Sequence, residues 1–90
     1  MKYVIEDDFH AEWVDQHATY EAALARLRQI AATPWRVAPN VTPCSTPECQ
    51  RTYHLIEYDD TTTPWTRVRG ELALKVSAAG VEWAPGFAPN

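Results

Sequence analysis

The stretch that decides the fold is Ala18–Ala32, which reads ATYEAALARLRQIAA. Its apolar side chains recur every three or four positions, the spacing of one face of an α-helix. Thr19 is suited to be the N-cap, and Glu21 follows in the first turn, where a carboxylate interacts favourably with the helix dipole. Pro34 ends the segment, because the residue before a proline avoids helical geometry. We therefore predict one amphipathic helix that needs a flat surface to cover its apolar face.

The length and composition indicate one small domain with a hydrophobic core. The chain has 90 residues, of which 46% are apolar, and it contains four tryptophans, four tyrosines and two phenylalanines. A domain of this size is marginally stable unless a staple or a partner contributes. The net charge of −4 is unlike the basic surface of a nucleic-acid-binding protein. Because no apolar run approaches the length of a signal peptide or a membrane helix, we expect a cytoplasmic chain without membrane contact.

Five segments have the composition and alternation of short β-strands. They are Lys2–Glu6, Phe9–Asp15, Arg51–Asp60, Trp65–Ser77 and Val81–Trp83. The segment Arg51–Asp60 carries apolar groups on both faces, so we expect it near the centre of the sheet. The order β-β-α-loop-β-β-β predicts an α+β fold, a small two-layer sandwich with a mainly antiparallel sheet of about four or five strands and one helix on one face. Residues 1–84 form this domain, and 85–90 are expected to be a flexible C-terminal tail.

The connection Thr33–Gln50 (TPWRVAPNVTPCSTPECQ) contains four prolines in eighteen residues. This density excludes regular helix or strand, and long connections without secondary structure are usually functional or disordered. We expect an ordered, proline-stiffened loop, with disorder as the alternative. A rigid backbone that carries a flat aromatic ring and cations is typical of a recognition surface. The sequence therefore predicts a contact surface in loop 33–51, formed by Trp35, Arg36, Asn40 and Arg51; the alternative for Trp35 is that it seals the helix end.

The two cysteines, Cys44 and Cys49, leave three alternatives open. Two cysteines are too few for a disulfide scaffold, and thiols in the cytosol are usually reduced. A disulfide between them would close a ring of six residues and constrain the unfolded chain by about 2 kcal/mol. The third alternative is a structural metal site completed by His54 or His17, because zinc prefers sulfur and nitrogen ligands.

A longer pattern links these cysteines to the N-terminal segment. The pair His10 and Glu12, spaced as His-x-Glu, is followed by Pro43-Cys44 and then by Cys49. This pattern resembles the signature of the zinc deaminases, in which a histidine and two cysteines hold zinc while a glutamate transfers protons at an activated water. The resemblance implies that His10, Cys44 and Cys49 are metal ligands and that Glu12 is the acid/base.

Together these observations predict a small, cytoplasmic, non-enzymatic binding or interaction module without a cofactor. Its partner is expected to be another protein or a second copy of the chain, since an apolar sheet face left uncovered by the helix would be closed by self-association into a homodimer. The alternative is a small zinc protein, with either a structural site of cysteine and histidine or a deaminase-like hydrolase activity.

Overall fold

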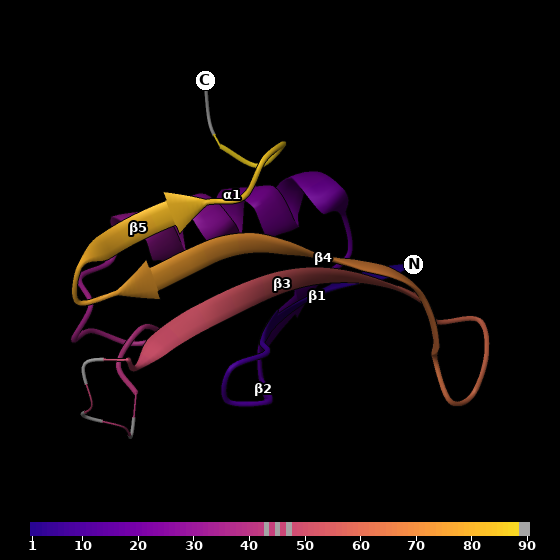
Figure 1. Cartoon of the computed structure of the whole chain (residues 1–90). Coiled ribbons are helices and arrows are strands. Elements are labelled where there is room, and N and C mark those ends of the chain that lie inside the picture. Colours follow the sequence, from indigo (N-terminus) through magenta and orange to yellow (C-terminus); the bar gives the residue numbers. More distant parts are fainter. Residues whose placement is uncertain (43, 45, 47, 89–90) are drawn as a thin grey trace.

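The computed structural model of the chain describes residues 1–42, 44, 46 and 48–88. Within these residues the elements are β1 (Lys2–Asp7), β2 (Glu12–His17), α1 (Tyr20–Ala32), β3 (Gln50–Asp59), β4 (Thr66–Ser77) and β5 (Gly80–Trp83). The strands pair antiparallel in the order β2-β1-β3-β4-β5, and α1 lies across one face of the sheet (Figure 1). The predicted two-layer α+β architecture is confirmed.

Helix α1 begins and ends where its sequence predicts. Thr19 is extended, and its hydroxyl oxygen accepts a hydrogen bond of 3.1 Å from the backbone N–H of Ala22. At the other end the N–H of Thr33 donates to the carbonyl of Ile30 at 3.0 Å. Among the described residues, no helix is long and apolar enough to cross a membrane. The side chains that α1 buries completely are Ala23, Leu27 and Ile30.

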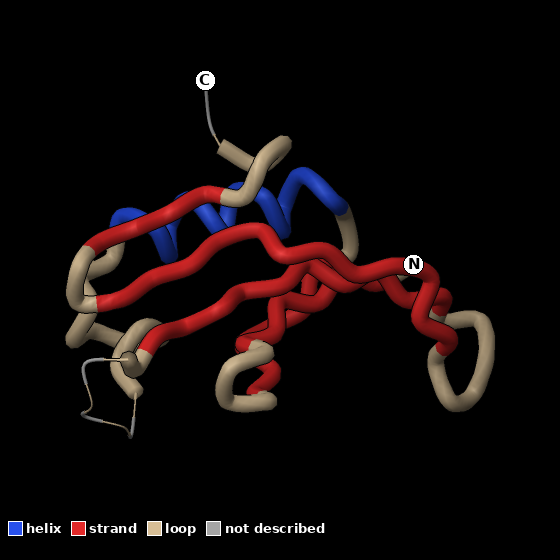
Figure 2. The backbone as a smooth tube through the Cα atoms, viewed as in Figure 1, coloured by secondary structure: helices blue, strands red, loops and turns tan. Residues whose placement is uncertain are grey.

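Strand β3 is the central strand, as predicted, and it pairs with β1 on one side and β4 on the other. Tyr53 and Leu55 belong to the cluster of buried side chains between α1 and the sheet, whereas Ile56 points to the other face by strand alternation. Figure 2 shows the long strands curving beneath the helix, with the proline-rich connection at one end of the sheet. Among the described residues from Thr33 to Cys49 no strand or helix occurs, and Gln50, the last residue of the predicted connection, begins β3. The predicted role of Pro43 and Pro47 lies outside the described residues.

Part of the predicted flexible tail is packed into the core. The N–H of Ala84 donates to the carbonyl of Ala73 at 2.9 Å, and the N–H of Phe87 donates to the carbonyl of Ala84 at 3.1 Å. Only 8% of Phe87 is exposed, and it belongs to the cluster that contains Leu27 and Tyr53. The Phe87 side chain therefore closes part of the apolar layer, whereas Pro85, Gly86 and Ala88 are exposed; a flexible tail stays a prediction, and residues 89 and 90 lie outside the described part.

The sheet face opposite α1 carries a cluster of aromatic rings. Trp13, Tyr58 and Trp65 lie with their ring centroids 6.0 to 6.2 Å apart. Trp13 is 54% exposed and Trp65 36% exposed. This cluster is the apolar surface on which the predicted homodimer depends, and self-association stays a prediction.

Candidate metal centre

The turn between β1 and β2 meets the loop that connects α1 to β3. His10 lies in the turn, and Cys44 and Cys49 lie in the loop. Nε2 of His10 is 3.3 Å from Sγ of Cys44 and 4.0 Å from Sγ of Cys49. These three ligand atoms all lie within 4.8 Å of one another, although 34 positions separate His10 from Cys44. The fold thus brings together three residues of the sequence pattern, His10, Cys44 and Cys49.

Asp7, the last residue of β1, fixes the orientation of His10. Its Oδ2 accepts a hydrogen bond of 2.5 Å from Nδ1 of His10, and its Oδ1 accepts from the backbone N–H of Phe9 and Thr52 at 3.1 and 2.9 Å. The bond from Phe9 closes an Asx turn, and Ala11 completes the reversal with a left-handed φ of 54°. Because Nδ1 is engaged, Nε2 is the ring nitrogen that faces the sulfur atoms.

A buried ion pair holds Asp7 in its charged form. Nη1 of Arg51 lies 2.8 Å from Oδ2 of Asp7 and 2.9 Å from Oε2 of Glu12, and the Asp7 side chain is fully buried. Burial alone would raise the pKa of Asp7, but hydrogen bonds from Thr52, Arg51 and His10 outweigh it and hold the pKa below its ordinary value. The same carboxylates raise the pKa of Arg51 against the effect of its own burial. Asp7 is therefore a fixed negative charge behind the imidazole.

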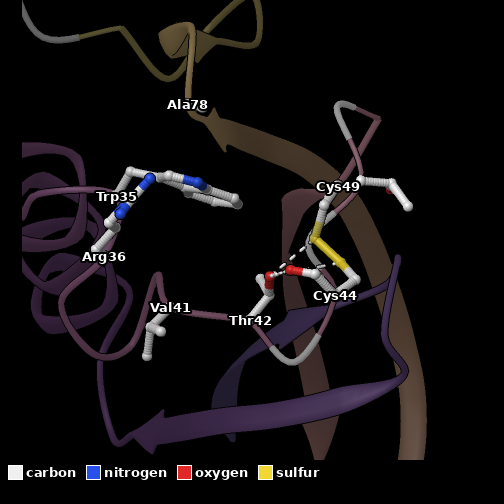
Figure 3. Close-up of a pocket in the computed structure, with 8 residues that line it drawn as sticks. Trp35, Arg36, Val41, Thr42, Cys44, Cys49 and Ala78 are labelled. Atoms are coloured by element: carbon white, nitrogen blue, oxygen red, sulfur yellow. Dashed lines mark hydrogen bonds between the residues drawn. A yellow bond between two sulfur atoms is a disulfide. The ribbon is translucent and has the colours of Figure 1, made fainter.

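Cys44 and Cys49 are joined by a disulfide, one of the three alternatives that the sequence leaves open. Cys49 is buried, with 5% of its surface exposed, whereas Cys44 is partly exposed. Oγ1 of Thr42 lies 2.8 Å from Sγ of Cys49 and 3.4 Å from Sγ of Cys44, as Figure 3 shows. The sulfur atoms are thus placed between a hydroxyl group and the imidazole of His10.

The donor set and its spacing fit zinc once the disulfide is reduced. Zinc binds thiolate sulfur at about 2.3 Å and imidazole nitrogen at about 2.0 Å, so a tetrahedral site places nitrogen and sulfur about 3.5 Å apart. The two distances from His10, 3.3 and 4.0 Å, bracket that value. Within the described residues the cluster supplies three protein ligands. A zinc ion held by these three residues would leave its fourth tetrahedral position to water or another external ligand.

The other two histidines are engaged elsewhere. Nε2 of His17 lies 2.9 Å from Oδ1 of Asp15, and Nδ1 of His54 lies 3.2 Å from the carbonyl oxygen of Thr52. In the part of the chain that the structure describes, neither histidine belongs to a cluster with metal-binding spacing. The structure therefore favours His10 over the His17 and His54 alternatives.

Glu12 departs from the role that the deaminase resemblance implies. Its side chain is 49% exposed and its Oε2 is bonded to Arg51. It also begins strand β2. Glu12 therefore acts as a second carboxylate for Arg51, which departs from the acid/base role that the resemblance implies.

Two of the four predicted binding residues hold the loop in place instead of facing a partner. Asn40 is fully buried, and its Nδ2 donates to the carbonyls of Ile30 and Thr33 at 3.1 and 2.9 Å. Arg51 is 6% exposed and donates to the carbonyl of Val41 at 2.6 Å. The polar atoms of both side chains form hydrogen bonds within the chain, so these side chains are not available to a partner.

The other two predicted binding residues line a cavity beside the disulfide. Arg36 is exposed and Trp35 is partly exposed, and together with Thr42 and both cysteines they enclose a volume of about 460 Å³. Figure 3 shows the indole of Trp35 lying across from the cysteines. Of the four residues predicted for a contact surface, Trp35 and Arg36 are the two that line this cavity, and the contact surface stays a prediction.

Two residues of the site, Asp7 and Thr42, are missing from the sequence-based predictions. Asp7 followed by Asp8 is typical of a turn, and the one local signal of its role is its spacing of three positions from His10. Thr42 has no such signal, because its partners are brought to it only by the path of the loop.

Comparison of the chain with protein-family models, with curated proteins and with solved structures finds no match. Its function has to be inferred from the geometry of the site.

Proposed function

We propose that the chain is a small zinc-binding protein whose metal site is formed by His10, Cys44 and Cys49 in the reduced state. The observation that carries the proposal is the position of Nε2 of His10, 3.3 and 4.0 Å from the two sulfur atoms, while its Nδ1 is bonded to the buried carboxylate of Asp7. A carboxylate behind a histidine ligand fixes the tautomer and makes the imidazole a better ligand. Thiolate and imidazole together suit zinc.

Three protein ligands and an open fourth position are the pattern of a catalytic zinc site, but the proposed role of the ion is structural rather than hydrolytic, because Glu12 is not free to act on a bound water. The carboxylate of Glu12, which a deaminase-like mechanism would need as acid/base, is bonded to Arg51. A metal that joins the β1–β2 turn to the proline-rich loop supplies stability that a core of this size lacks. A cytoplasmic location, where thiols remain reduced, is part of this proposal.

The second candidate function is the interaction module predicted from the sequence, with another protein or a second copy of the chain as its partner. The observation that favours it is the exposed stack of Trp13 and Trp65, whose ring centroids are 6.2 Å apart. Sedimentation equilibrium of the wild type and of Trp13→Ser tests it: concentration-dependent association that the substitution weakens supports the module, and a monomer at all concentrations contradicts self-association.

The zinc proposal is tested by titrating the chain with Zn²⁺ after reduction by a phosphine, which does not compete as a thiol. We expect one ion per chain, and Co²⁺ in its place should give the intense visible bands of a tetrahedral site with sulfur ligands. His10→Gln and Cys44→Ser should each weaken binding at least tenfold, whereas His54→Gln should leave it unchanged. The proposal is overturned if the reduced, folded wild type binds no zinc, or if the His10→Gln variant binds zinc as tightly as the wild type does.

A further inference from the structure

We propose that the cavity beside the Cys44–Cys49 disulfide admits a small anionic thiol, which reduces the disulfide by attack on Cys44. The cavity places both cysteines in its wall together with Trp35, Arg36 and Thr42. Its volume of about 460 Å³ lies within the range of small-molecule sites. This reaction needs no bound metal, so it goes beyond the proposed zinc site and is tested separately from it.

Accessibility selects the sulfur atom that is attacked. Cys44 is partly exposed, whereas Cys49 is buried with 5% of its surface exposed. Thiol–disulfide exchange requires the incoming thiolate to reach one sulfur while the other departs. Cys44 is therefore the attacked residue, and Cys49 is the leaving group.

Thr42 is placed to stabilise that leaving group. Its Oγ1 lies 2.8 Å from Sγ of Cys49. In the oxidised chain the hydroxyl also reaches the carbonyl of Cys44 at 3.1 Å, and its proton can turn to the sulfur when negative charge develops there. A hydrogen bond from a hydroxyl to a buried thiolate offsets part of the cost of placing the charge away from water. Thr42 thus acts as a positioning residue for the exchange.

The exchange balances in two steps. The thiolate of the small molecule attacks Sγ of Cys44, the bond between Cys44 and Cys49 breaks, and Cys49 departs as a thiolate with the electron pair. A second small thiolate then attacks the small-molecule sulfur now bonded to Cys44, so that Cys44 is released as a thiolate and a small-molecule disulfide forms. Each small thiolate loses one electron, the protein disulfide gains two, and the protons exchange with water.

Arg36 gives the cavity its preference for an anion. It is exposed at the cavity wall and forms no ion pair with any residue in the described ranges. The chain as a whole carries a net charge of −4, which by itself would repel an anionic thiol and attract a cationic one. A measured preference for the anionic thiol would therefore be caused by Arg36, because the electrostatic field of the net negative charge favours the cationic thiol.

The test compares the rates at which 3-mercaptopropionate and cysteamine reduce the wild-type disulfide, in the presence of a metal chelator. Each rate is divided by the rate of the same thiol with a neutral model disulfide, which corrects for intrinsic nucleophilicity. We expect the anion to be preferred at least about fivefold, because one charge pair in contact through water supplies about that factor and Arg36 repels the cationic thiol in addition. Arg36→Gln should abolish the preference, and Arg28→Gln, which removes an exposed helix cation away from the cavity, should preserve it.

The choice of sulfur is tested with single-cysteine variants exposed to the symmetrical disulfide of 3-mercaptopropionate. Cys49→Ser should form a mixed disulfide at Cys44 at least tenfold faster than Cys44→Ser forms one at Cys49, as counted by mass spectrometry. Thr42→Val should slow reduction of the wild-type disulfide several-fold without changing the preference for the anion.

Three outcomes overturn the proposal: equal normalised rates for the two thiols, equal labelling of the two cysteines, or reduction that proceeds only at the rate of global unfolding. The comparison of thiols on the wild type stands even where a cysteine variant fails to fold. Zinc binding is measured on a chain reduced by a phosphine, so it does not depend on reduction by a small thiol. A failure of the thiol exchange therefore leaves the zinc result intact, and a failure to bind zinc leaves the exchange result intact.

Discussion

The hydroxyl group of Tyr53 donates a hydrogen bond of 2.7 Å to Oδ1 of Asn40, and both side chains are fully buried. Nδ2 of Asn40 donates in turn to the carbonyls of Ile30 and Thr33 at the end of α1. The carbonyl of Ile30 also accepts from the N–H of the C-cap residue Thr33, whereas the carbonyl of Thr33 lies past the last helical residue, where the helix supplies no donor. One amide side chain therefore connects the central strand, the helix end and the proline-rich loop.

Replacement of Asn40 by alanine should destabilise the fold by about 3 kcal/mol, because it leaves several buried polar groups without partners. Urea unfolding of the oxidised protein measures this loss. Gln16→Ala, at an exposed position of β2, serves as the control and should change stability by less than about 0.5 kcal/mol. In the double variant with Tyr53→Phe, a coupling energy of about 1 kcal/mol is expected, and strict additivity would show that the two side chains act independently.

Alkaline pH should weaken the fold through Tyr53. Burial raises the pKa of Tyr53 above its ordinary value of about 10. Above that pH the unfolded chain loses the proton first, so the contribution of Tyr53 is complete below about pH 10 and declines at about 1.4 kcal/mol per pH unit as the pH rises. Unfolding curves from pH 9 to 11.5 should show that the free energy of unfolding declines less steeply with pH in Tyr53→Phe than in the wild type, with Tyr58→Phe as the control. The same dependence on pH in the wild type and both variants would contradict this assignment.

Replacement of Arg51 by methionine should cost about 3 kcal/mol or more, since it leaves the buried carboxylate of Asp7 without its cation. The exposed pair between Arg69 and Glu57, at 3.1 Å, provides a matched control because 63% of the Arg69 side chain is exposed. Arg69→Met should therefore change stability by about 0.5 kcal/mol or less. Chemical denaturation at neutral pH measures both, and equal effects at the two sites would argue against a special role of the buried pair.

Phe87→Ala should destabilise the chain by about 3 kcal/mol, the usual cost of removing a buried aromatic ring. The comparison is with Phe9→Ala, because Phe9 is 49% exposed in the β1–β2 turn whereas Phe87 is 8% exposed. Thermal unfolding should place the melting temperature of Phe87→Ala well below that of Phe9→Ala. Equal melting temperatures would mean that residues 85–88 do not contribute to the core.

Reduction of the Cys44–Cys49 disulfide should lower stability by about 2 kcal/mol, because the oxidised bond closes a ring of only six residues. On the proposed function, Zn²⁺ at a hundred times its dissociation constant should then restore about 2.7 kcal/mol. Denaturation of the oxidised, reduced and zinc-treated chain separates these states. His10→Gln should remove the gain from zinc and keep the loss on reduction, and a gain that persists in this variant would place the ion elsewhere.

The elements whose signals are local in the sequence are the ones that could be predicted from it. The helix is encoded by its own apolar stripe, its N-cap Thr19 and the proline that follows its end, so neighbouring residues suffice to define it. The central position of β3 follows from apolar residues on both of its faces, such as Leu55 and Ile56. The burial of Phe87 could not be predicted, because the proline and glycine around it indicate a loose end and the residues that contact it lie far away in the chain.

The candidate site was only partly predictable, for the same physical reason. The residue types of His10, Cys44 and Cys49 suggest a metal site, and their chemistry identifies them despite their separation. Asp7 carries no such mark: an aspartate before a second aspartate is typical of a turn, and its partner Arg51 lies 44 positions away. Arg51 was predicted as a contact residue, since a cation in a loop-rich region is usually solvated. No local pattern reports that a charge will be buried.

The location of His10 in a turn at the edge of the sheet has a mechanical consequence. The disulfide ties two positions within one loop, and the first hairpin is held to the rest of the molecule by the ladder between β1 and β3 and by the ion pairs of Arg51 with Asp7 and Glu12. An ion shared with His10 would anchor that hairpin to the middle of the chain through a closure of more than thirty residues. Because His10 follows β1 in the chain, a pull on the N-terminus would open the β1 ladder first and load the coordination bonds only afterwards, so an occupied site would keep the turn fastened to the loop after the strand has detached.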